Sequence, residues 1–509
     1  MKKIFAHIIP FPLHCFLVPV FFILHNYFYF YSLIDMDELY TYYLWWLFLP
    51  LLLLSVLNYL FKNLSKVALF TTILLVVYFF FSAFTRGIKT IPVLEILGRY
   101  SISLPLLLIF FTIGYRTLKK TKTNFLKAHW FLFSLFLLLI AVDLLIYLPQ
   151  GTGRLKAANS FKTFNRVALK PVPVDSTRPD IFFLVFDEHP STASIKRLTG
   201  YDNSVLDSQL TKLGFKVSPF ATSAFSQTQP ALCSVFDMGE YPYNPEQPAG
   251  FKELFAAGEL LAKNQLLTFL QQQQYTIVNA SVFPFQNLTA IETPKEWWGY
   301  QSDMIKNQTI FNRINEDIGW LKAKYFPSLF TNPIERSIRT DVDLTDSVQK
   351  IIHRTINEPS SMPRFVFAHF FLPHDPYKFD STGNIFNGSY PEYLESTKTY
   401  QPFVQQVVYT RKLMLRLASD ILAKNKRPSI IIIQGDHGLR KYDKAKFGNK
   451  EVFNIFSAVY LPDRAMNNFP GDLYAPNTFR IILNRYFQQQ LPLLQKQQAA
   501  ADRSMRKNQ

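Results

Sequence analysis

The sequence predicts an N-terminal α-helical transmembrane bundle of about five spans, followed by a C-terminal α/β/α sandwich with a mostly parallel sheet. Residues 1–149 are dominated by Leu, Phe, Ile, Val and Tyr, whereas residues 150–509 have the mixed composition of a globular protein. In the second half, short apolar runs alternate with helical stretches, which is typical of a parallel sheet covered on both faces. A chain of 509 residues is also too long for one ordinary domain.

Five apolar runs in the first half are long enough to cross a bilayer, which takes about 20 residues of helix. They lie near residues 8–33, 40–61, 67–85, 100–117 and 128–148. Runs such as LWWLFLPLLLLSVLNYLF have no polar face, so we interpret them as membrane spans rather than as buried helices of a soluble core. The first run is too long for a signal peptide, and no small-residue cleavage site follows it.

Basic residues set the expected orientation, because cytoplasmic loops are enriched in Lys and Arg. With the N-terminus in the cytoplasm, the basic residues on the cytoplasmic side are Lys2, Lys3, Lys62, Lys66, Arg116, Lys119, Lys120, Lys122 and Lys127. The loop at 35–38 is acidic and lies outside, whereas Arg86, Lys89 and Arg99 depart from the rule, because they also lie outside. We therefore expect a multi-pass protein of the cell membrane, with a cytoplasmic N-terminus and a periplasmic or extracellular C-terminal half.

The formal charge of +17 raises the question of nucleic-acid binding. Much of this charge lies in the cytoplasmic loops. The stretch after the fifth run adds Arg154, Lys156, Lys162, Arg166 and Lys170. Basic clusters beside a span attract anionic head groups, so we predict a membrane-surface role and no nucleic-acid partner. The two cysteines, Cys15 and Cys233, lie in different halves of the chain, so we expect no disulfide.

The second half divides into a juxtamembrane linker (150–178), a globular domain (179–488) and a Gln-rich tail (489–509) that we expect to be disordered. Five apolar runs predict strands at residues 181–186, 275–280, 364–371, 429–434 and 455–461. Helical spacing predicts helices at residues 203–214, 258–274 and about 399–424.

Side chains that can bind a metal follow three of the predicted strands. The run at 181–186 leads into Asp187, Glu188 and His189, the run at 364–371 into His374 and Asp375, and the run at 429–434 into Asp436 and His437. Ligands of open α/β sheets bind outside the carboxyl ends of the strands, so these side chains should converge. Asp and His together suit a divalent ion such as Mn, Mg or Zn. The alternative is that they are ordinary turn residues, since Asp favours strand exits.

A metal centre of this kind can activate a hydroxyl nucleophile and neutralise phosphoryl oxygens. The segment ATSAFSQTQPALCSVFDM, residues 221–238, offers several hydroxyls. Pro230 suits the first turn of a helix, which places Thr228 near a helix N-terminus, where backbone N–H groups favour an anion. Thr222, Ser223 and Ser226 remain alternatives, because spacing alone does not choose among the hydroxyls.

The blocks around these residues resemble the alkaline phosphatase/sulfatase superfamily over roughly residues 180–485. They are most similar to its membrane-anchored branch, which includes lipoteichoic acid synthases and lipid A phosphoethanolamine transferases. The resemblance is carried by FLVFDEHPS, GYDNSVLDSQLTKLGF, FSQTQPALCSVFDM, HFFLPHDPYKFD, IIIQGDHGLRK and FNIFSAVYLP, in this order. It implies a sulfatase-like fold for the large domain and an enzyme with one divalent metal ion.

The resemblance also implies a metal-ligand set. In this superfamily an acidic residue after the first strand, a Thr nucleophile and an Asp-His pair bind the metal. By position these are Asp187, Thr228, Asp436 and His437, with Glu188 as a substitute for, or a helper of, Asp187.

Two further residues are implied to contact the substrate phosphate. His374 matches a His of the HDPY-like block that usually does so, and Arg440 is a candidate because guanidinium binds phosphate bidentately. The implied reaction has two steps: Thr228 attacks the phosphorus of a membrane lipid donor, and the phospho-Thr then passes its group to a glycan or lipid acceptor, or to water.

One departure from the superfamily narrows the chemistry. Sulfatases carry a Cys or Ser that opens a C/S-x-P-x-R signature, whereas Cys233 is followed by SVFD, so sulfate-ester hydrolysis is not expected. Two alternatives to the transferase stay open. One is a phosphodiesterase or phosphatase that uses the same residues, and the other is a non-catalytic membrane protein that binds a glycan or a partner assembly.

Overall fold

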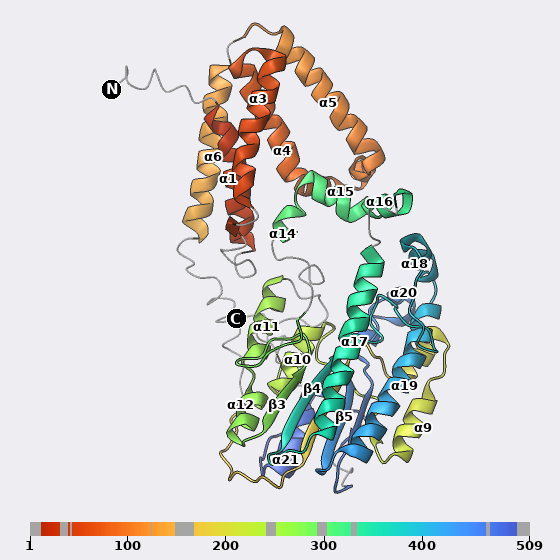
Figure 1. Ribbon diagram of the computed structural model, residues 1–509. Coiled ribbons are helices and arrows are strands. Elements are labelled where there is room, and N and C mark those ends of the chain that lie inside the picture. Colours follow the sequence, from red (N-terminus) through yellow and green to blue (C-terminus); the bar gives the residue numbers. More distant parts are fainter. Residues whose placement is uncertain are drawn as a thin grey trace. The chain divides into compact units, whose positions relative to one another are not determined.

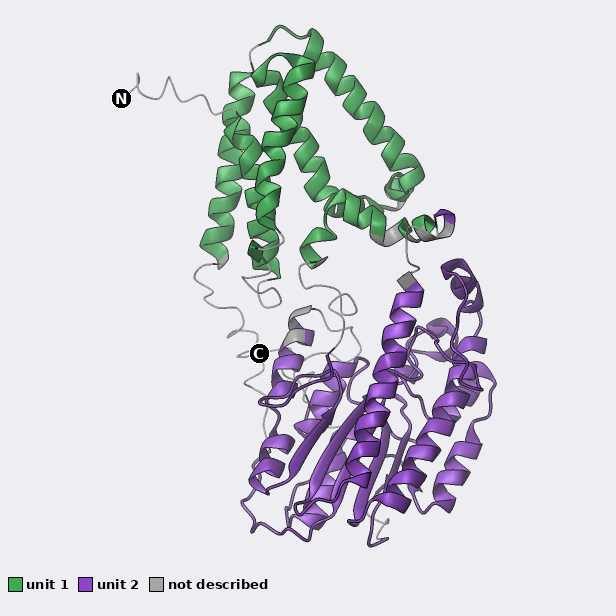
Figure 2. Cartoon of the chain, viewed as in Figure 1, with its two compact units in different colours: residues 1–156, 298–322 green, residues 157–297, 323–509 purple. Residues whose placement is uncertain are grey.

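The computed structural model describes residues 12–30, 39–40, 43–123, 125–147, 167–240, 251–292, 303–326, 333–464 and 469–495. The chain divides into two compact units (Figure 2): a helical unit of residues 1–156 and 298–322, and an α/β unit of residues 157–297 and 323–509. The domain limits expected from the sequence, at 149, 178 and 488, stay predictions. Residues 150–166 of the expected linker and 496–509 of the expected tail lie outside the described residues.

The helical unit consists of apolar helices with short 3-10 segments. Its elements are α1 (Leu13–Tyr29), η2 (Leu44–Phe48), α3 (Leu49–Phe61), α4 (Leu64–Lys89), η3 (Pro92–Gly98), α5 (Tyr100–Lys120), α6 (Leu126–Tyr147), α14 (Asp303–Lys306) and α15 (Ile310–Ile318). Among the described residues, four stretches are long and apolar enough to cross a membrane: Leu44–Phe61, Leu64–Lys89, Tyr100–Lys120 and Leu126–Ile146. The fifth apolar helix, α1, has 17 residues. The predicted apolar runs thus correspond to five helices of this unit.

Two polar pairs join α1 to α6. Near the start of both helices, His14 Nε2 lies 2.7 Å from His129 Nδ1. Near the end of both, His25 Nδ1 lies 3.0 Å from Asp143 Oδ2. Polar groups inside an apolar bundle need such partners, because lipid offers none. One pair joins the starts of the two helices and the other joins their ends. The helices α1 and α6 therefore run in the same direction.

A segment from the middle of the second half belongs to the helical unit. Ile305 of α14 is fully buried in the apolar core of that unit. The Ser82 backbone N–H at the end of α4 donates to the Gln308 carbonyl over 3.3 Å, and the rings of Tyr78 and Phe311 lie 5.7 Å apart. No pattern in the sequence indicated this insertion.

The α/β unit is built on one six-stranded sheet (Figure 1) with the order β2-β6-β5-β1-β4-β3. The strands are β1 (Asp180–Phe186), β2 (Lys216–Val217), β3 (Thr276–Ala280), β4 (Arg364–Phe370), β5 (Ser429–Gly435) and β6 (Ser457–Tyr460). β5, β1, β4 and β3 are parallel, whereas β6 is antiparallel to β5 and β2 is antiparallel to β6. Every residue of β1, β4 and β5 is buried, which explains their uninterrupted apolar sequences. The predicted mostly parallel sheet is confirmed.

Helices cover both faces of this sheet. The helices of the α/β unit are α8 (Thr192–Thr199), α9 (Ser204–Lys212), α10 (Thr228–Phe236), α11 (Phe251–Ala262), α12 (Gln265–Gln272), α17 (Pro333–Asn357), α18 (Tyr390–Ser396), α19 (Gln401–Lys424), α20 (Lys444–Phe447), η5 (Glu451–Phe453), η7 (Ala475–Asn477) and α21 (Thr478–Tyr486), whereas α16 (Trp320–Tyr325) spans the limit between the two units. Phe183 and Phe236 of α10 belong to one apolar core, and Phe182 and Leu417 of α19 to another. Side chains of β1 thus point alternately into two cores, as in an α/β/α sandwich.

One predicted helix differs from the structure. The stretch at 258–274 forms two helices, α11 and α12, rather than one. Asn264 separates them, because its side chain accepts a hydrogen bond from the Leu267 N–H over 2.8 Å and so caps a new helix. The expected helices at 203–214 and 399–424 correspond to α9 and α19.

Candidate active site at the carboxyl end of the sheet

Three neighbouring strands bring the site residues together. β1 lies between β4 and β5, and its last residue, Phe186, is in register with Phe370 and with Gly435. The residues that follow each strand therefore emerge at one edge of the sheet, as predicted from strand order. Gly435 is required at this point, because a Cβ there would lie 2.3 Å from the His189 carbonyl oxygen.

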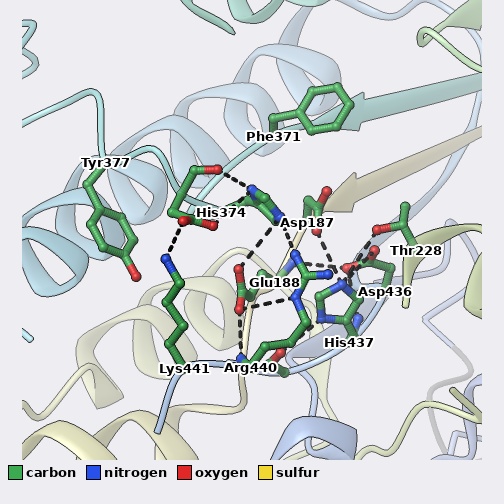
Figure 3. A network of polar contacts seen from close by, with 12 residues as sticks. Asp187, Glu188, Thr228, Phe371, His374, Tyr377, Asp436, His437, Arg440 and Lys441 are labelled. Carbon is green, nitrogen blue, oxygen red and sulfur yellow. Dashed lines mark hydrogen bonds and ion pairs between the residues drawn. The ribbon is translucent and has the colours of Figure 1, made fainter. Parts of the chain in front are cut away.

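Asp187, Asp436 and His437 form one buried cluster (Figure 3). One ligand atom from each lies within 4.8 Å of the others. His437 Nε2 is 3.4 Å from Asp187 Oδ1 and 3.6 Å from Asp436 Oδ2. Two carboxylates and an imidazole at these separations form a donor set that suits Mn, Mg or Zn.

The hydrogen bonds of the cluster leave two carboxylate oxygens without hydrogen-bond partners. Asp436 Oδ1 accepts hydrogen bonds from the backbone N–H groups of Glu188 and His437, at 3.0 and 2.8 Å. Asp436 Oδ2 and Asp187 Oδ1 are buried with no hydrogen-bond partner. His437 Nδ1 lies 2.9 Å from the Gly438 carbonyl oxygen, so it carries the proton and leaves the Nε2 lone pair free to bind a cation.

Electrostatics also favours a cation here. Burial raises the pKa of Asp187 well above its ordinary value, and the charge of Asp436 raises it further. Burial acts in the same direction on Asp436, but His437 and the other partners outweigh it and lower the pKa of Asp436. Two buried carboxylates with unpaired oxygens are costly unless positive charge lies between them. The residues present therefore fit one divalent ion.

Thr228 is the hydroxyl that reaches this cluster. It is the first residue of α10, and its Oγ1 lies 3.5 Å from His437 Nε2. Pro230 follows in the first helical turn, where a missing N–H costs nothing. The alternatives are placed differently: the Thr222 backbone pairs with Leu473 and Ala475, and Ser223 Oγ accepts a hydrogen bond from the Phe225 N–H.

Glu188 belongs to a second cluster, beside the first. Its φ of 60° lies in the left-handed region, and this turn points its side chain away from Asp187. Glu188 Oε1 accepts a hydrogen bond from the Arg440 backbone N–H over 2.6 Å, and Glu188 Oε2 lies 3.8 Å from His374 Nε2. Asp375 completes this set of metal-competent groups.

Cations line this second cluster. An Arg440 Nη2 group donates to His374 Nε2, and Lys441 Nζ lies 2.5 Å from Asp375 Oδ2. Burial lowers the pKa of His374, and Arg440 lowers it further, against the opposing effect of Glu188. Neutral His374 and the guanidinium of Arg440 thus lie side by side, a combination suited to hold the oxygens of a phosphoryl group.

A buried clamp that the sequence did not reveal holds the loop with His374. Lys378 Nζ is fully buried and lies 2.7 Å from Asp341 Oδ2 of α17 and 2.6 Å from the Phe371 carbonyl oxygen. Gln406 of α19 donates to the His374 carbonyl over 2.9 Å and accepts from the Lys378 N–H over 2.7 Å. Two helices distant in sequence thus fix this loop. The one sequence feature that pointed to this clamp was Lys378 itself, directly after the HDPY motif.

Removing one partner of this clamp should destabilise the protein strongly. Lys378→Met leaves the Asp341 carboxylate buried without its cation, and we expect the free energy of unfolding to fall by about 3–5 kcal/mol. The double variant Lys378→Met/Asp341→Leu removes both charges and should recover most of this loss. Unfolding of the full chain in detergent measures both. A double variant as unstable as Lys378→Met would contradict this account of the clamp.

The fold and the site together define the class of protein: an α/β enzyme domain with a cluster of buried carboxylates and an imidazole that could hold a metal ion, and an adjacent hydroxyl, at the carboxyl end of the parallel strands. A family model described as Sulfatase matches residues 188–476, which is more than half of the chain. The chain belongs to the sulfatase family, whose members are enzymes of the alkaline phosphatase/sulfatase superfamily. No curated protein matches it in sequence.

Solved structures with a similar fold are distant in sequence. The C-terminal periplasmic domain of phosphoethanolamine transferase EptC from Campylobacter jejuni has 12% identity and a TM-score of 0.37, over 63% of this chain and 92% of that one. The zinc complex of that domain of EptC from Escherichia coli has 14% identity and a TM-score of 0.37, over 63% and 86%. The integral membrane protein EptA, a lipooligosaccharide phosphoethanolamine transferase from Neisseria meningitidis, has 10% identity and a TM-score of 0.36, over 92% and 95%.

Proposed function

We propose that this membrane protein transfers a phosphorus-containing head group, of the phosphoglycerol or phosphoethanolamine kind, from a membrane lipid to a glycan or lipid of the cell envelope. The observation that carries the proposal is the Thr228 hydroxyl, 3.5 Å from His437 Nε2 in the metal-competent cluster. The same chain carries apolar helices that are suited to a membrane, where a lipid donor is at hand.

The proposed reaction has two steps. Thr228 Oγ attacks the phosphorus of the donor, a bond from Oγ to phosphorus forms, and the bond from phosphorus to the lipid oxygen breaks. The departing lipid alcohol takes up the proton that the Thr228 hydroxyl loses. The acceptor hydroxyl then attacks the same phosphorus, a bond from its oxygen to phosphorus forms, and the bond from phosphorus to Thr228 Oγ breaks. Thr228 Oγ takes up the proton that the acceptor hydroxyl loses.

Other side chains supply binding and charge. Asp187, Asp436 and His437 would hold one divalent ion, which when bound supplies positive charge to acidify a hydroxyl and to neutralise phosphoryl oxygens. His374 and Arg440 are placed to orient the phosphoryl oxygens, and the Lys378 clamp keeps the His374 loop in position. Glu188 orients Arg440 by accepting its backbone N–H.

The direction of the helices supports the proposed orientation. Because α1 and α6 run in the same direction, the first residue of α1 and the last residue of α6 lie at opposite ends of the bundle. The basic residues Lys119 and Lys120 end α5, and Lys127 begins α6, and this excess of basic residues favours the cytoplasmic side for the connection. The N-terminus is then cytoplasmic and the α/β unit lies outside the cytoplasm.

Transfer and hydrolysis are distinguished by the fate of the head group. The full chain is incubated in detergent with a phospholipid that carries a labelled head group, and with an extract of envelope glycans and lipids. We expect the label to move to the extract and the lipid to become diacylglycerol, with a rate that rises with acceptor concentration. Release of water-soluble label at a rate independent of acceptor would instead show a hydrolase.

A further inference from the structure

The hairpin between α4 and α5, residues 84–99, carries charge that the proposed reaction does not use. Arg86, Lys89 and Arg99 lie on the outer side in the proposed orientation, against the usual excess of basic residues inside. The orientation rule therefore does not explain these three cations. We call residues 84–99 the outer hairpin.

The three cations of the outer hairpin are close together. Arg86 and Lys89 are one turn apart at the end of α4, and Arg99 directly precedes α5. The Lys89 side chain passes over Gly98, where a Cβ would lie 2.8 Å from Lys89 Cγ, so it reaches the neighbour of Arg99. All three are exposed, and within the described part of the chain no carboxylate forms an ion pair with them. Arg86 donates to the neutral Gln308 side chain over 2.6 Å.

Large apolar side chains are exposed among these cations. Val93 is 85% exposed and Phe84 65% exposed, and Ile91 and Ile96 of the same hairpin are exposed as well. Such a mixture of apolar and basic side chains is unfavourable in water but suits the boundary between acyl chains and head groups. Glu95 is the one acidic residue of the hairpin sequence, so the hairpin keeps a net positive charge.

An apolar surface continues from the hairpin along α5. This helix contacts the bundle at its start, where the Tyr100 ring lies 6.1 Å from Phe81, and in its second half, where the Phe111 ring lies 6.0 Å from Phe70 and the Tyr115 ring 5.0 Å from Phe61. Between Tyr100 and Phe111, α5 diverges from α4 (Figure 1). Its exposed apolar side chains there are Leu106, Leu108, Ile109 and Phe110. A lipid with its phosphate at the hairpin would lay its acyl chains along this surface.

We propose that the outer hairpin binds an anionic phospholipid of the outer leaflet, with its phosphate at Arg86, Lys89 and Arg99. The exposed side chains of η3 insert at the acyl boundary and α5 receives the tails. The site rests on the orientation proposed above and not on the transfer reaction. It lies entirely within the helical unit.

Binding of a fluorescent phosphatidic acid, an anionic phospholipid with no head group to transfer, to the full chain in neutral detergent tests this site. We expect Arg86→Gln/Lys89→Gln/Arg99→Gln to bind about a hundredfold more weakly, because each cation near anionic lipid contributes about a factor of five. The matched control is Lys119→Gln/Lys120→Gln/Lys122→Gln, which removes the same charge from the cytoplasmic connection. It should bind within about twofold of the unmodified chain, since its charges lie at the other membrane face.

Two further variants keep the result interpretable. The charge-conserving Arg86→Lys/Lys89→Arg/Arg99→Lys should retain binding, so a loss there would show a structural role instead. Thr228→Ala should bind the probe normally, which separates this site from the reaction. Should the outer triple variant bind as well as the unmodified chain, or should the cytoplasmic triple variant lose as much, the proposal is overturned.

Discussion

Thr228→Ala should lower head-group transfer by at least about a thousandfold, because the variant has no oxygen to form the bond to phosphorus. Asp187, Asp436 and His437 remain in this variant, so it should still bind the metal. Thr228→Ser keeps a hydroxyl at the same position and should keep a measurable part of the activity. The measurement is the initial rate of label transfer from the donor lipid at saturating acceptor.

Ser226→Ala is the matched control for this prediction. Ser226 lies two residues before Thr228, the first residue of α10, and was a rival nucleophile on sequence spacing, but the structure records the contact to His437 for Thr228. We expect Ser226→Ala to transfer within about threefold of the unmodified rate. A Thr228→Ala protein that transfers label at a similar rate, or a Ser226→Ala protein that does not, would remove Thr228 from the mechanism.

The second large effect concerns the metal. Asp187→Asn and His437→Ala each remove one donor of a three-residue cluster, and we expect both to lose the bound divalent ion and the transfer activity together. Glu188→Gln is the informative comparison. Its carboxylate faces Arg440 and His374 rather than the cluster, so this variant should keep the ion while transfer falls about tenfold to a hundredfold.

Elemental analysis of the purified full chain measures the bound divalent ion, and transfer assays on the same samples measure the activity. The unmodified protein should carry about one divalent ion, and chelation followed by dialysis should remove both ion and activity, with recovery on adding back Mn, Mg or Zn. Loss of the ion from Glu188→Gln but not from Asp187→Asn would exchange the roles of the two acidic residues. The sequence left these roles open.

The sheet and the metal cluster could be predicted from the sequence because both follow from local pattern. Uninterrupted apolar runs such as IFFLVF and SIIIIQ are typical of strands buried on both faces, and β1, β4 and β5 lie where these runs predict. Parallel strands end at one edge, so the residues after them, Asp187, Asp436 and His437, were expected to meet. These residues are distant in sequence, but neighbouring parallel strands bring them together.

Other parts could not be predicted, because they depend on contacts between distant segments. Spacing left Thr228 among several hydroxyls, the family resemblance selected it, and the three-dimensional contact to His437 agrees with that choice. The Lys378 clamp joins two helices to one loop, and no local pattern marks Asp341 or Gln406 as its partners. The packing of Ile305 and Gln308 in the helical unit likewise depends on contacts between distant segments.

The central claim is a phosphorus-containing adduct on Thr228, and mass spectrometry of the full chain tests it most directly. The protein is mixed with donor lipid without acceptor, quenched in acid and digested. We predict a peptide from residues 221–238 that carries the head group on Thr228, appears with one equivalent of diacylglycerol and disappears when acceptor is added. Turnover of donor lipid without any such adduct, or with the adduct on another residue, would contradict the account.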